Sequence, residues 1–149
     1  MIKSFLFPTC YGEKSYSVFL LALRILFGLL LASHGLQKLL AYSSLAAGGF
    51  PDPLGIGSGA SACLAIFGEL FCSVAFIFGF LYRLSMVPMI VTMAVAFGAV
   101  HGWSINQGEL AFAYLLVFIV MYIAGPGLYS VDGLIAKKFY GHSRRVRMV

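Results

Sequence analysis

The stretch YSVFLLALRILFGLLLASHGLQKLL, residues 16–40, decides the fold of this chain. It is almost entirely apolar, and a helix of this length crosses the roughly 30 Å hydrocarbon core of a bilayer. It nevertheless contains Arg24, His34, Gln37 and Lys38. We therefore predict a membrane-spanning helix whose polar residues are kept away from lipid.

Three of these four polar residues share one side of the predicted helix with two glycines and a leucine. At about 100° per residue they fall within an arc of roughly 120°. The residues on this arc are Arg24, Gly28, Leu31, His34, Gly35 and Lys38. An ionised group that faces lipid costs about 2.5–3.5 kcal/mol. We therefore expect this side to contact protein or water, with the other spans as the walls around it.

The composition of the whole chain is that of an integral membrane protein. Of its 149 residues, 61% are hydrophobic and only 10% are charged, and the mean hydropathy is +0.97. A soluble domain carries about 25% charged residues. The net charge of +5 does not indicate a nucleic-acid partner, because half of the ten basic residues follow residue 136, as in a cytoplasmic tail near anionic lipid. The three cysteines form no CxxC pair, so we predict no disulfide framework.

The hydropathy pattern predicts an all-α integral membrane protein, an antiparallel four-helix bundle with a short C-terminal surface helix. Ser85 is the expected cap of the third helix, and Ser130 that of the surface helix over 131–139. We divide the chain into a cytoplasmic N-terminal segment (1–15), a membrane domain (16–134) and a basic cytoplasmic tail (135–149). The predicted spans are about 16–40, 59–80, 85–101 and 109–124.

The distribution of Lys and Arg predicts the orientation. Outside the spans, these residues lie in the N-terminal segment, in the turn after the second span and in the tail. The opposite loops hold none, apart from Lys38 at the end of the first span. The positive-inside rule then places both termini in the cytoplasm. The Gly- and Pro-rich loop 41–58 carries too few charges for an ordinary solvated loop, and we expect it to fold back over the mouth of the bundle.

Arg24 and Glu69 are the first candidates for a functional site. Counted from the inner ends of their spans, they lie about 12 Å and 16 Å deep, so an arginine side chain could bridge the difference. A lone carboxylate and a lone guanidinium in neighbouring spans are each costly without a partner. We therefore predict that they pair, either as a structural ion pair or as part of a ligand pocket or proton path.

A second group of polar residues gathers at the outer mouth. His34 and Lys38 are one turn apart on the same helix face, and His101 ends the third span at a similar depth. We interpret them as polar groups around a water-filled opening. Two histidines also invite a haem or metal interpretation, but the chain offers no third ligand in a suitable spacing, so we predict no metal site and regard haem as a poor fit.

The order of these residues resembles the DoxX family of small four-span bacterial membrane proteins. The matching positions are Arg24, Gly28, His34-Gly35, Lys38-Leu39, Phe50-Pro51, Glu69, Gly79 and Arg83, followed by Gly125-Pro126-Gly127 and Ser130-Val131-Asp132. The resemblance covers roughly residues 17–134. It implies a multi-pass protein of the bacterial cytoplasmic (inner) membrane that associates with redox enzymes, as in the related thiosulfate:quinone oxidoreductase subunit.

Our first functional hypothesis is a quinone- or small-ligand-binding membrane subunit of an oxidoreductase system. Arg24 and Glu69 would form the floor of its pocket, and His34, Lys38 and His101 its opening. The alternative is a non-catalytic scaffold or assembly factor for partner proteins. A small-solute transporter is a third interpretation and would require a homodimer, because four spans make only a narrow path. Whether the protein is an enzyme stays open, as do the ligand, the partner subunits and the oligomeric state.

Overall fold

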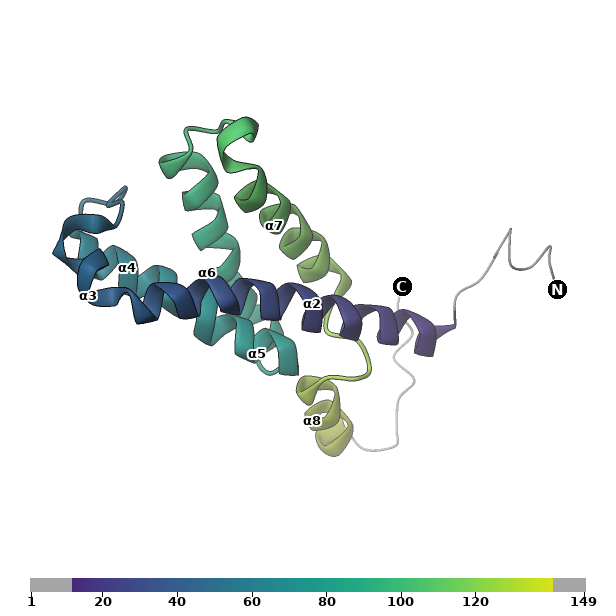
Figure 1. The fold of residues 1–149 in the computed structure, drawn as a ribbon. Coiled ribbons are helices and arrows are strands. Elements are labelled where there is room, and N and C mark those ends of the chain that lie inside the picture. The colour runs from purple at the N-terminus through teal and green to yellow at the C-terminus, as the bar shows by residue number, and fades with distance from the viewer. Residues whose placement is uncertain (1–11, 141–149) are drawn as a thin grey trace.

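The computed structural model describes residues 12–140 of the chain. This part is built from helices and contains no strand. Four helical segments are long and apolar enough to cross a membrane: Glu13–Leu40, Ser58–Phe78, Tyr82–Val100 and Ile105–Ala124. The predicted all-α membrane bundle is therefore confirmed (Figure 1). Much of the N-terminal segment and of the basic tail, with Cys10, lies outside the described residues.

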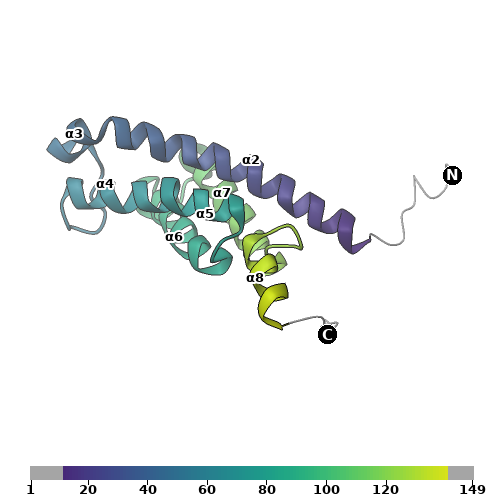
Figure 2. The same cartoon turned by 90° about the horizontal axis from the view of Figure 1, so that it is seen from below.

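The first two spans form an antiparallel hairpin. Helix α2 (Glu13–Leu40) runs along a continuous helix made of α4 (Ser58–Ile66), η2 (Phe67–Phe71) and α5 (Cys72–Phe78). Figure 2 shows α4 and α5 following one another in a line beneath α2. Between the two arms, α3 (Tyr42–Ser44) and η1 (Leu45–Gly49) extend the line of α2 beside the start of α4.

Glycines set the register of this hairpin. Gly28 faces Ile77, Gly35 faces Leu70, and Gly59 faces Ala46. The antiparallel register is therefore the same along the whole hairpin. At Gly35, an added Cβ would lie only 2.6 Å from the backbone nitrogen of Leu70. The two helices therefore approach more closely than any other residue would permit.

The last two spans form a second hairpin that lies obliquely across the first (Figure 1). It consists of α6 (Tyr82–Val95), η3 (Ala96–Val100) and α7 (Ile105–Ala124). Trp103 in the short connection packs its ring against Gly98 and, edge to face, against Phe97 at a centroid distance of 5.5 Å. The exposed indole lies where an interfacial aromatic residue is expected.

The core between the hairpins is made of methionine and aromatic side chains. Phe76 from the first hairpin stacks on Tyr82 and meets Phe118 edge to face, with both centroid distances at 5.6 Å. Met86, Met89, Met93 and Met121 fill the remaining space. Large apolar side chains on the outer faces, such as those of Phe71, Phe78 and Ile123, are exposed, as expected for surfaces that contact lipid.

Two helix starts test the capping predictions. Ser130 does cap the C-terminal helix α8 (Val131–Tyr140), because its hydroxyl accepts the Gly133 N–H at 3.0 Å. Ser85 does not cap the third span, which begins earlier, at Tyr82. Its cap comes from far along the chain: the carboxylate of Asp132 accepts the N–H groups of Leu81 and Tyr82 at 2.9 and 2.8 Å.

Candidate functional site: an apolar pocket with a buried ion pair

A pocket of about 260 Å³ lies between the ends of the two hairpins that are distant from α8. The loop after η1 contributes one wall, as expected from its low charge, with Phe50, Pro51, Pro53 and Leu54. Helices α4, α6 and η3 contribute mainly small and apolar residues. The polar residues of the lining are Lys38, Ser61, Glu69, Thr92 and His101.

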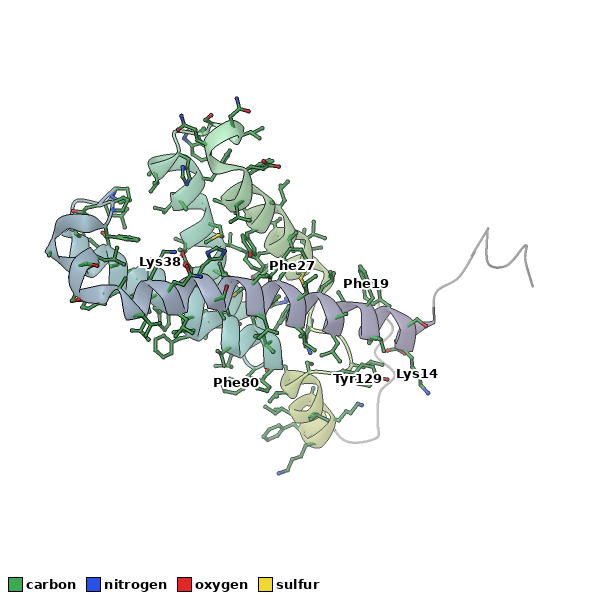
Figure 3. All side chains as sticks on the ribbon, in the orientation of Figure 1. Lys14, Phe19, Phe27, Lys38, Phe80 and Tyr129 are labelled. Atoms are coloured by element: carbon green, nitrogen blue, oxygen red, sulfur yellow. The ribbon has the colours of Figure 1, made fainter. Side chains whose placement is uncertain are left out.

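An ion pair between Lys38 and Glu69 lies at this pocket. The ammonium group of Lys38 donates to the carboxylate of Glu69. The Glu69 side chain is only 4% exposed, whereas 28% of the Lys38 side chain remains accessible. Figure 3 shows Lys38 extending from the part of α2 nearest to α4. The lysine therefore satisfies a carboxylate that would be costly in an apolar bundle and keeps part of its own surface available to a ligand.

Two departures from regular α-helix adjoin the pocket. Glu69 lies within the π-helical turn η2, and His101 directly follows the π-helical turn η3. A π-turn inserts an extra residue into the helical ladder and re-aims the side chains around it, and such turns occur frequently at functional sites. The local backbone thus supports a ligand site at this position.

Asp52 holds the loop that covers the pocket. Its carboxylate accepts the Ser61 hydroxyl at 2.7 Å and the backbone N–H groups of Gly57 and Ile56 at 2.8 and 3.1 Å. These hydrogen bonds, that of Ser61 first, lower the pKa of Asp52 below its ordinary value. Asp52 therefore ties the loop to the start of α4.

The predicted contact between Arg24 and Glu69 is wrong. Glu69 pairs with Lys38, and the guanidinium of Arg24 donates to two backbone carbonyls beyond α7, those of Pro126 at 2.8 Å and of Tyr129. Arg24 is almost fully buried at this second location. It is therefore part of the connection between α7 and α8 and not of the pocket.

The reason for the error is the register of the first hairpin. The prediction placed the start of the first span level with the end of the second. Helix α2 instead starts well beyond that level, and Arg24 lies beside Gly79 at the end of α5. Gly79 is ten residues from Glu69, or about 15 Å along the helix. It adopts a left-handed conformation (φ 65°), and a Cβ there would collide with Arg24 and Ser130.

The outer-mouth residues divide into two groups. Lys38 and His101 line the pocket as a pair of hydrogen-bond donors, but His34 does not line it. The His34 ring lies edge to face on Tyr114, at a centroid distance of 6.3 Å, between α2 and α7. Sequence reasoning also missed Thr92 as a lining residue; its closeness to Gly68 gives no signal in the sequence, because it depends on how α6 crosses η2.

Within residues 12–140, no group of three or more His, Cys, Asp or Glu side chains could hold a metal ion. The pocket is instead suited to a compact organic molecule, because apolar walls surround a few donors and one carboxylate.

The fold and the pocket define a multi-pass membrane protein with several apolar helices and a buried polar site. Residues 19–102 match the DoxX family, and the chain belongs to that family. The matched region contains Arg24, Lys38, Glu69 and His101, and ends before α7. Comparison with curated proteins and with solved structures finds no match.

Proposed function

We propose that the pocket beside the Lys38–Glu69 pair binds a small, flat molecule with hydrogen-bond-accepting oxygens, most suitably the headgroup of a quinone. The protein would then be a membrane subunit of an oxidoreductase system. The observation that carries this proposal is an ion pair in the wall of a pocket whose remaining lining is mostly apolar.

The chemistry of the lining suits a quinone. Its carbonyl oxygens need hydrogen-bond donors, which Lys38 and His101 can supply. Reduction of a quinone to a quinol consumes two electrons and two protons. Glu69 beside Lys38 could pass protons to a carbonyl oxygen, whereas the electrons would come from a redox-enzyme partner.

The size and surroundings of the pocket support the same class of ligand. A volume of about 260 Å³ is slightly below the roughly 300 Å³ at which ordinary ligand pockets begin, and suits a headgroup better than a whole lipid-soluble quinone. Leu54, Leu64 and Val91 line the pocket and are also exposed on the outer surface. An apolar tail could therefore leave the pocket along these side chains and continue into the bilayer.

Quinone binding by the purified protein tests this proposal. Glu69→Gln and Lys38→Met should each weaken binding of a short-chain ubiquinone or menaquinone analogue by roughly tenfold or more, since a hydrogen bond to a charged group contributes about 1.5–3 kcal/mol. Glu109→Gln is the matched control, because this exposed carboxylate of α7 does not line the pocket. Equal affinities of all four proteins would refute the proposal.

Arg24 supports the alternative hypothesis that the protein is a non-catalytic scaffold or assembly factor. This buried arginine, the strongest sequence candidate for the pocket, donates hydrogen bonds to two backbone carbonyls and does not line the pocket beside Glu69. If Lys38 and Glu69 are structural in the same way, a Lys38→Glu/Glu69→Lys double variant should restore the abundance that each single variant loses. Restored abundance together with no quinone binding by the unaltered protein would favour a non-catalytic assembly factor.

We also propose that the protein lies in the bacterial inner membrane with both termini in the cytoplasm. The bundle end that contains the α5–α6 turn and α8 carries Lys14, Arg83, Lys137 and Lys138, while loops 41–57 and 101–104 contain no Lys or Arg. A C-terminal reporter that is active only in the cytoplasm tests the orientation: the fusion should be active, and a fusion that is produced but inactive would contradict it. We also propose that the protein forms a homodimer. The mass of the purified protein in solution tests this.

A further inference from the structure

A second hollow, of about 660 Å³, lies at the basic end of the bundle. The first turns of α2 extend past the end of α5, and α8 lies below this overhang (Figures 1 and 2). The walls of this groove are mostly apolar. Leu21, Ile25, Ile77, Phe78 and Leu134 form them. The groove is separate from the pocket beside the Lys38–Glu69 pair, with which it shares no lining residue.

All the charged residues that line the groove are basic. They are Lys14 from α2, Lys137 from α8 and Arg24 at the base. Two nitrogens of the Arg24 guanidinium donate to the Pro126 and Tyr129 carbonyls, and its buried Nε has no acceptor among residues 12–140. The groove thus combines apolar walls with three positive charges and no carboxylate of its own.

We propose that the groove binds one anionic phospholipid. The phosphate would lie between Lys14 and Lys137, and an acyl chain would follow the apolar wall formed by Ile25, Ile77 and Phe78. A free phosphate would gain nothing from that wall, and a neutral lipid would gain nothing from the lysines. Basic pockets between membrane helices on the cytoplasmic side suit anionic headgroups in this way.

Two further observations support a position of the groove near the lipid headgroups. Figure 3 shows Lys14 and Tyr129 at the same end of α2, and both line the groove. Helix α8 exposes Leu134 and Phe139 and carries Lys137 and Lys138 in its last turn, as in a helix that lies in the membrane interface. The bound lipid would connect α2 to α8, in addition to the hydrogen bonds that Arg24 and Ser17 of α2 form with the segment before α8.

Native mass spectrometry of the full chain tests this proposal. The protein would be released from nanodiscs that contain phosphatidylcholine and phosphatidylglycerol, and the fraction that retains each lipid would be measured. The unaltered protein should retain one phosphatidylglycerol in preference to phosphatidylcholine. The Lys14→Gln/Lys137→Gln variant should lose roughly 30-fold of this preference, because each lysine near an anionic surface contributes about a fivefold factor.

Lys138→Gln is the control for the α8 half of this variant, since it removes one charge from the same helix as Lys137→Gln but from a residue that does not line the groove. It should keep the preference for phosphatidylglycerol. The proposal is overturned if this control loses as much as the double variant, or if the double variant keeps the preference. It is also overturned if inorganic phosphate displaces the lipid, which would indicate a site for a free anion. None of these results depends on quinone binding.

Discussion

Replacement of Arg24 by methionine is the most informative perturbation of this structure. Methionine keeps the apolar stem but removes both hydrogen bonds to the carbonyls of Pro126 and Tyr129. Hydrogen bonds from a charged donor contribute about 1.5–3 kcal/mol each, so their loss costs about 3–6 kcal/mol. Part of this loss of stability is offset, because the variant no longer buries a charge. We expect a net loss of about 2–4 kcal/mol.

The loss should be local. Arg24 connects α2 to the segment between α7 and α8, which Ser17 also holds through the Leu128 N–H at 3.2 Å. A destabilisation of 2–4 kcal/mol corresponds to hydrogen exchange that is faster by roughly 30- to 1,000-fold. We therefore expect this acceleration in peptides that cover residues 125–136, and little change around Glu69.

Hydrogen exchange followed by mass spectrometry of the protein in nanodiscs measures this effect. Arg83→Met is the matched control, because that exposed arginine lies over the Tyr122 ring at 5.9 Å, forms no hydrogen bond or ion pair with its side chain among residues 12–140, and should change exchange little. Arg24→Lys should give an intermediate result, since one ammonium group cannot reach both carbonyls with the geometry of a guanidinium. Unchanged exchange over 125–136 in Arg24→Met, or faster exchange centred on Glu69, would refute the assignment.

Three further predictions follow from the pocket and the hairpin. Lys38→Met and Glu69→Gln should each lower the unfolding temperature in detergent, and the double variant should lose less than their sum, with a coupling of about 0.5–3 kcal/mol; additive losses would mean that the pair does not form. Gly35→Ala should cost about 1–3 kcal/mol, because its Cβ would lie 2.6 Å from a backbone nitrogen of the opposite helix. Gly12→Ala, where a Cβ meets none of the described residues within 4 Å, is the control, and equal losses would contradict the close approach. Because folding lowers the pKa of Asp52, its contribution to loop stability is complete above the ordinary carboxyl pKa and disappears as the pH falls through the lowered value. Proteolysis of loop 50–57 should therefore accelerate only in acid, and Asp52→Asn should remove that pH dependence; an unchanged profile would exclude this carboxylate.

The sequence predicted those features of the structure that depend on interactions between residues close together in the chain. The length and hydropathy of each span depend only on neighbouring residues, and the structure contains four helices that are long and apolar enough to cross a membrane, as these patterns indicated. The Ser130 cap was predicted for the same reason, since its acceptor and donor are three residues apart. The Ser85 prediction failed because the cap of that helix comes from Asp132, about 50 residues away.

The sequence by itself determined that Arg24, Lys38 and Glu69 must be sheltered from lipid, because the cost of an ionised group in hydrocarbon holds in any fold. It also placed them in the first two spans. Only the tertiary structure decided which charges meet. The close contact at Gly35 sets how far α2 slides along its partner, and this shift brings Lys38 to Glu69 and moves Arg24 to the carbonyls beyond α7.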